Sequence, residues 1–155
     1  MSLEKSLLAS QGYLELGMPD ESLAELDRLP EDVKHTEPVL SIRLTIFMAA
    51  KRWEDALPVC EALRRVAPSN SIGFIHGAFC LHELGRTAEA LQLLLTMPSS
   101  LKKEAVYHYN LGCYYAVLGQ PDEACRHLQK SFELDSKFRE IAKRDPDLVS
   151  VKDLL

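Results

Sequence analysis

The sequence has few of the features that mark secreted, membrane-spanning or disulfide-rich proteins. Its four cysteines, Cys60, Cys80, Cys113 and Cys125, have a spacing that suggests neither a disulfide framework nor a zinc site. No apolar stretch is long enough to cross a bilayer, and the first residues lack the basic start and apolar run of a signal peptide. We therefore expect reduced thiols and a cytoplasmic location.

Catalytic motifs and clusters of positive charge are also lacking. The chain has no glycine-rich phosphate loop, no nucleophile elbow and no metal-protease helix motif. Its net charge is −5, and residues 1–37 alone hold nine acidic and three basic side chains, a local charge of −6. Non-specific nucleic-acid binding depends on clustered Lys and Arg, so we expect none. We also expect no catalysis, no cofactor and no bound metal.

What the sequence does contain is a turn that recurs every 34 residues. The clearest copy is Leu118-Gly119-Gln120-Pro121-Asp122-Glu123-Ala124, and earlier copies span 84–90, 50–56 and 16–22. The small residues that close the copies keep the spacing without a slip: Ser22, Ala56, Ala90 and Ala124. Such a period indicates stacked supersecondary units. It predicts an all-α fold of four antiparallel helix pairs, with repeats at about 3–36, 37–70, 71–104 and 105–138.

The fourth repeat resembles the tetratricopeptide (TPR) pattern. It carries His108-x2-Leu111-Gly112-x2-Tyr115, then Gly119, then Ala124-x3-Leu128. The resemblance implies a single domain of residues 1–155, a right-handed solenoid in which small residues lie where paired helices cross. We assign these crossings to Gly112 with Ala124, Ala78 with Ala90, Ser10 with Ser22, and Ala56 opposite Leu44.

Helical spacing and capping residues give approximate bounds for the helices. We expect helices over 3–16, from Pro19 to the loop at 30–36, over 36–50, 53–66, 71–84, 87–97, from 99 or 100 to 118, and over 121–134. A capping helix should follow at 137–144. The apolar residues after it either fold back on the helix at 121–134 or form a loose docking tail, and we favour the first because solenoid ends need covering.

In TPR proteins the first helix of each pair lines a concave groove, so the resemblance implies a set of partner-binding positions. Mapped through the repeat register, they are Thr45, Met48, Ile72, Ile75, Phe79, His82, Tyr109, Asn110 and Cys113. The aromatic pair Phe79 and Tyr109 are the expected anchors. The groove lacks the Lys, Arg and Asn clamp with which chaperone-binding TPR domains hold a terminal carboxylate. In an alternative interpretation, the C-terminal segment fills part of this groove.

Two other side-chain groups are better explained by packing than by chemistry. His76, Cys80 and Cys113 could be neighbours, but no fourth ligand is evident and an interior histidine is the simpler interpretation. His108 and Trp53 are interpreted as packing residues.

The sequence therefore favours a cytoplasmic adaptor that binds a peptide or helix of a protein partner. Two alternatives remain open: a chaperone for a dedicated client, similar to the small acidic TPR chaperones of bacterial secretion systems, and an accessory of a cytoskeletal filament, loosely similar in role to the TPR domains of kinesin light chain. The partner and the oligomeric state do not follow from the sequence.

Overall fold

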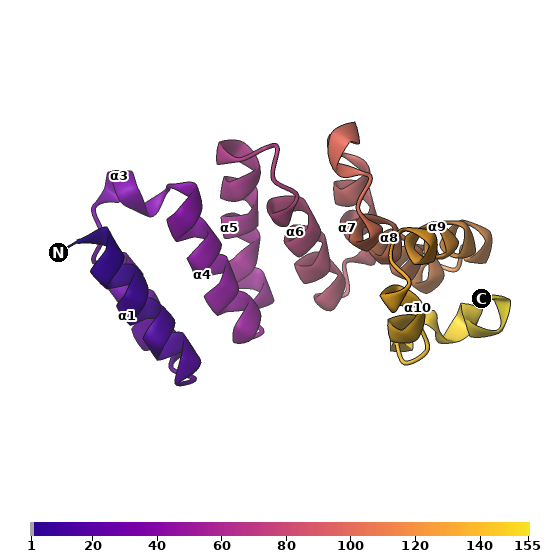
Figure 1. The fold of residues 1–155 in the computed structure, drawn as a ribbon, viewed down its shortest axis with the longest axis horizontal. Helices are drawn as coiled ribbons and strands as arrows, with labels where there is room; N and C mark the ends of the chain where they lie inside the picture. Colours follow the sequence, from indigo (N-terminus) through magenta and orange to yellow (C-terminus); the bar gives the residue numbers. More distant parts are fainter. Residues whose placement is uncertain (1) are drawn as a thin grey trace. The chain divides into compact units, whose positions relative to one another are not determined.

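The structure, a computed structural model, describes residues 2–155 and is helical, with no strand in that range (Figure 1). The expected all-α fold is thus confirmed. The elements are α1 Leu3–Glu15, α2 Pro19–Asp27, α3 Glu31–Lys34, α4 Glu37–Ala49, α5 Trp53–Val66, α6 Ile72–Glu83, α7 Thr87–Leu95, η1 Ser99–Leu101, α8 Ala105–Val117, α9 Pro121–Leu134, α10 Lys137–Ala142 and η2 Pro146–Leu154. No helix among the described residues combines the length and apolar composition needed to cross a membrane.

The repeated turn has the same backbone geometry in all four copies. Gly17, Lys51, Gly85 and Gly119 follow one another at intervals of 34 residues, and each has a positive φ, of 71°, 54°, 77° and 77°. In each turn the next residue donates its backbone N–H to a carbonyl five residues earlier, as from Gln120 to Tyr115 (2.9 Å). This pattern closes the first helix of a pair with a left-handed residue and allows the chain to reverse.

The chain forms two compact units, Met1–Gly73 and Phe74–Leu155. In the first unit, α1 packs on α2 and α4 packs on α5. Ser10 and Ser22 are fully buried where α1 meets α2, and their hydroxyls lie 2.9 Å apart. The Ser10 hydroxyl lies 2.9 Å from the Ser22 carbonyl and the Ser22 hydroxyl lies 2.5 Å from the Ser10 carbonyl, so two polar groups without access to water are paired.

In the second unit, α8 and α9 make the closest helix pair, and Gly112 lies at their crossing. A Cβ atom at Gly112 would lie 2.5 Å from Cγ of Leu128 and 3.2 Å from the carbonyl oxygen of Ala124. Only a residue without a side chain fits this approach. Ala78 and Ala90 are fully buried in the same apolar core.

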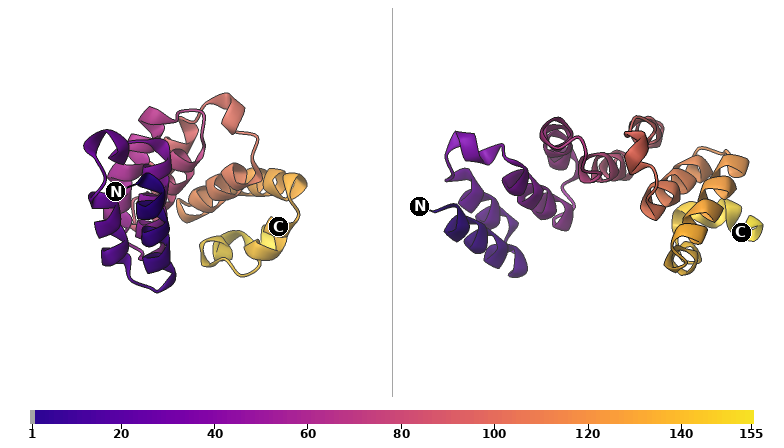
Figure 2. Two further views of the ribbon diagram at one scale, coloured as in Figure 1. Left: turned by 60° about the vertical axis from the view of Figure 1, so that its left-hand side comes forward. Right: turned by 45° about the horizontal axis from the view of Figure 1, so that its top comes forward.

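The C-terminal segment, residues 137–155, belongs to this core. Figure 2 shows it lying beside α8 and α9, which η2 contacts directly. Ala142, Leu148 and Val151 are buried among the core residues of the second unit.

Two local expectations differ from the structure. The expected loop at 30–36 contains the one-turn helix α3, in which Glu31 pairs with Lys34 at 2.9 Å and both charges complement the helix dipole. The expected early start of the helix before 118 is wrong: η1 is separate, and α8 begins only at Ala105, after an extended Glu104.

Candidate functional site

The predicted partner-binding residues fall in both units. In the first unit, Thr45 and Ile72 are exposed and Met48 is half-buried. The Thr45 hydroxyl donates to the Ser41 carbonyl of its own helix (3.0 Å), so its methyl group is what it offers to a partner. Apolar atoms at exposed helix positions of this kind provide contact area for a partner but do little to fix the orientation in which it binds.

In the second unit, the predicted residues differ in their exposure. Phe79, His82 and Asn110 are half-buried, whereas Ile75, Tyr109 and Cys113 are buried. Tyr109 is 6% exposed, because the C-terminal segment covers it. Its ring lies 5.0 Å from the ring of Phe138, centroid to centroid.

Two aspartates of the C-terminal segment contact three of the predicted residues. The Tyr109 hydroxyl donates to Oδ2 of Asp145 (2.7 Å), and the Cys113 thiol lies 3.7 Å from the same oxygen. Nε2 of His82 lies 2.8 Å from Oδ2 of Asp147. The structure therefore brings His82, Tyr109 and Cys113 together through a segment that follows the last repeat.

Burial and the neighbouring carboxylates determine the protonation of Tyr109 and Cys113. Burial raises the pKa of Tyr109, and its hydrogen bond to Asp145 raises it further, so the hydroxyl remains a donor. Burial also raises the pKa of Cys113, with added contributions from the negative charges of Asp145 and Asp147. Both groups are uncharged donors near neutral pH, facing carboxylates that accept.

The sequence analysis did not include Asp145, Asp147 and Phe138 among the site residues. Their contacts with Tyr109 and His82 join positions 29 to 65 residues apart and lie outside the 34-residue period. The stretch Asp145-Pro146-Asp147 follows α10, and nothing in its sequence pattern indicates which side chains it contacts.

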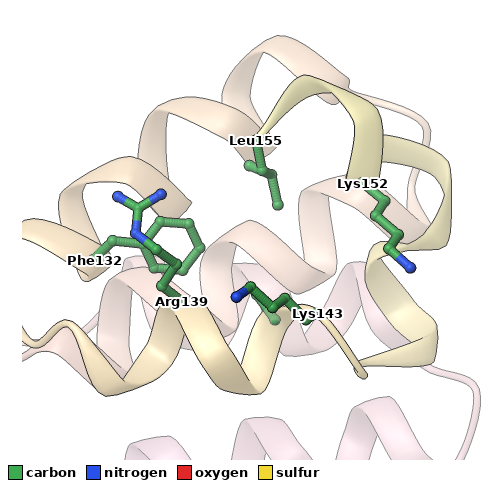
Figure 3. Close-up of a pocket in the computed structure, with 6 residues that line it drawn as sticks. Phe132, Arg139, Lys143, Lys152 and Leu155 are labelled. Atoms are coloured by element: carbon green, nitrogen blue, oxygen red, sulfur yellow. The ribbon is translucent and has the colours of Figure 1, made fainter.

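A pocket of about 210 Å³ is lined by residues of α9 and of the C-terminal segment (Figure 3). Its lining residues are Phe132, Arg139, Ala142, Lys143, Lys152 and Leu155. The Arg139 guanidinium lies over the Phe132 ring at 4.9 Å, and Lys143 pairs with Glu140 at 2.8 Å. The pocket lining thus combines apolar side chains with three positively charged ones, Arg139, Lys143 and Lys152.

His108 and His127 form a second polar cluster between α8 and α9. Their Nδ1 atoms lie 3.1 Å apart, so one nitrogen donates and the other accepts. Burial lowers the pKa of His127 to about 4, with a further contribution from Arg126. His108 is also held neutral by burial, which lowers its pKa. These rings act as a neutral packing pair.

His76 is the interior histidine that the sequence analysis considered with Cys80 and Cys113. Its Nδ1 atom is buried and has no hydrogen-bond partner among residues 2–155. Burial lowers its pKa, so the imidazole is neutral.

Comparison with known proteins identifies the repeats. A tetratricopeptide repeat family model matches residues 105–138, and a second model of the same description matches residues 78–96. No curated protein sequence matches the chain.

Solved structures share the fold at low sequence identity. A MamA structure (MSR-1) is 22% identical with a TM-score of 0.74, over 89% of this chain and 79% of that one. MamA from Desulfovibrio magneticus RS-1 is 19% identical with a TM-score of 0.77, over 90% and 79%. YrrB, described as a TPR protein with an unusual peptide-binding site, is 18% identical with a TM-score of 0.71, over 88% and 72%. The two matches identify tetratricopeptide repeats at residues 78–96 and 105–138, and the four turns in one 34-residue register and the solved structures support the same repeat fold for the rest of the chain.

Proposed function

We propose that the protein is a non-catalytic scaffold that binds a segment of a protein partner on the face formed by the first helices of its repeats. The observation that carries this proposal is the seating of the C-terminal segment on α8. There the Tyr109 hydroxyl and the Cys113 thiol of α8 meet the carboxylate of Asp145, and the His82 imidazole of α6 meets the carboxylate of Asp147 in η2. A face that accepts such a segment from its own chain has the chemistry to accept one from a partner.

The partner would contact the part of this face that the C-terminal segment leaves partly accessible. Phe79 and Asn110 are half-buried there, so the aromatic ring offers apolar contact area and the amide offers hydrogen bonds. Thr45, Met48 and Ile72 are proposed contacts on the first unit. YrrB, a TPR protein of this fold with an unusual peptide-binding site, supports peptide binding as the mode of interaction.

The test compares Phe79→Ala with Leu95→Ala in the full chain. A partner segment is first identified by affinity capture, synthesised as a peptide, and titrated by calorimetry. Phe79→Ala should weaken binding about tenfold or more, because truncating a central aromatic commonly costs about 2 kcal/mol. Leu95, an exposed leucine of α7, should be neutral.

A different outcome would place partner binding on the acidic first repeat. If Phe79→Ala binds normally while charge reversal at Glu21 and Glu25 abolishes binding, the acidic first repeat is the interaction surface. In that case added salt should also weaken the complex strongly, whereas binding on the Phe79 face should change little with salt.

A further inference from the structure

Three potential metal ligands meet where the C-terminal segment crosses α8, and a histidine of α6 adjoins them. Among residues 2–155, the ligand atoms of Cys113, Asp145 and Asp147 all lie within 4.8 Å of one another. Nε2 of His82 is 2.8 Å from Oδ2 of Asp147, so an imidazole adjoins the group, although it does not lie within 4.8 Å of all three ligand atoms. In the described chain no Lys or Arg forms an ion pair with either carboxylate, so two negative charges face one histidine and one thiol.

We propose that His82, Cys113, Asp145 and Asp147 form a zinc site that fastens the C-terminal segment to α6 and α8. Thiolate sulfur, imidazole nitrogen and carboxylate oxygen are the ligands that Zn²⁺ takes in tetrahedral protein sites. Calcium and magnesium prefer oxygen alone, so the thiol and imidazole select against them.

The separation of Cys113 and Asp145 suits a single ion, and His82 has to move toward these two side chains to become the fourth ligand. Sulfur and oxygen bound to one tetrahedral Zn²⁺ lie about 3.6 Å apart, and Sγ of Cys113 is 3.7 Å from Oδ2 of Asp145. Nitrogen and oxygen ligands lie about 3.4 Å apart, so Asp147 has to withdraw slightly from His82. Its side chain is 32% exposed, which gives it room to move and gives the ion a route from solvent.

Outer contacts orient two of the four ligands, His82 and Asp145. Oγ1 of Thr87 lies 2.9 Å from Nδ1 of His82 and directs Nε2 at the cluster. The Tyr109 hydroxyl and the backbone N–H of Asp147 donate to the two oxygens of Asp145, at 2.7 and 3.0 Å. Supporting hydrogen bonds of this kind are typical around metal ligands, and losing one commonly costs 10- to 100-fold in affinity.

A divalent cation also offsets the unfavourable charge arrangement. Asp145 and Asp147 place two carboxylates within 4.8 Å of each other and of the Cys113 thiol. Bound Zn²⁺ attracts all three groups, and the Cys113 thiol proton is released to solvent on binding.

The experiment uses Co²⁺ as a spectroscopic probe of the full chain after treatment with a chelator. We expect one Co²⁺ per chain, a thiolate-to-cobalt charge-transfer band in the near ultraviolet, loss of the band when Zn²⁺ is added, and a higher Tm with Zn²⁺. Cys113→Ser should abolish the band, whereas Cys125→Ser, at a half-buried cysteine outside the cluster, should keep it. Asp147→Asn should weaken binding at least about tenfold relative to Asp153→Asn, an exposed aspartate of the same segment.

Two results would overturn the proposal: absence of the charge-transfer band in the full chain, and a band that survives Cys113→Ser. If Cys113→Ser does not fold, Asp147→Asn against Asp153→Asn and Thr87→Val against the unchanged chain decide the question by affinity alone. None of these variants changes Phe79, so a failed zinc site leaves the proposed partner binding to its own test.

Discussion

Gly112 shows how a single position controls the packing of a helix pair. Its missing side chain allows Leu128 and the Ala124 carbonyl of α9 to approach α8 closely. By contrast, Gly12 in α1 has no atom within 4 Å of the place where a Cβ would lie. The same substitution at the two positions therefore separates packing from helix propensity.

We predict that Gly112→Ala lowers the free energy of unfolding by about 1–3 kcal/mol, because the added methyl group overpacks the crossing. Gly12→Ala should instead raise it by roughly 0.5–1 kcal/mol, since alanine favours the helix where space is open. Urea denaturation followed by circular dichroism measures both. Equal effects of the two substitutions would mean that the crossing does not depend on Gly112.

At the scale of elements, the C-terminal segment is an integral part of the second unit. Leu148 is 1% exposed in its core, whereas Leu154, six residues later in the same η2, is 59% exposed. These two leucines distinguish a segment that folds back on the repeat from a loose docking tail.

We predict that Leu148→Ala destabilises the protein by about 2–5 kcal/mol, because it leaves a cavity in the core. Leu154→Ala should change stability by no more than about 0.5 kcal/mol, as is usual for exposed positions. Thermal unfolding of the two variants provides the comparison. Identical melting temperatures would indicate that the segment is detached in solution.

The His108–His127 pair makes the α8–α9 contact sensitive to pH. The pKa of His127 is lowered to about 4 in the folded chain, whereas an unperturbed histidine has a pKa of about 6.5. The unfolded chain thus binds more protons between these values, so the histidine's contribution to stability is complete above pH 6.5 and is lost as the pH falls toward 4.

We accordingly expect the Tm of the unchanged protein to fall between pH 7 and pH 4 more steeply than that of His127→Gln. The slope of Tm against pH is compared, and not Tm itself, because glutamine at position 127 also alters the contact with His108. Parallel slopes would show that His127 is as accessible to protons in the folded chain as in the unfolded one.

At the scale of the whole molecule, the two compact units share one helix. The boundary between Gly73 and Phe74 falls inside α6, Ile72–Glu83. Unfolding either unit alone would break this helix near its first turn, and repeat proteins couple their units through such neighbouring elements.

We therefore predict that residues 1–155 unfold as a single domain. Calorimetry should give one transition whose van't Hoff and calorimetric enthalpies agree. Two resolved transitions would show that the units fold independently and that the single-domain prediction is wrong.

The sequence by itself determined the helical repeat architecture. Its signals are local: a left-handed turn residue at 17, 51, 85 and 119 and small residues near each crossing. Because these interactions connect residues close in the chain and recur at a fixed interval, the pattern predicts the fold class and most helix bounds. Helix propensity alone did not predict the interruption between η1 and α8, where Glu104 has an extended backbone.

Only the tertiary structure decided what covers the face of α8. The contacts of Asp145 with Tyr109 and of Asp147 with His82 join residues 36 and 65 positions apart. They involve a segment that occurs once, so no repeat register reports its partners. The segment lies there because Leu148 and Val151 have to bury their apolar surface, and this burial brings two carboxylates to a thiol, a hydroxyl and an imidazole.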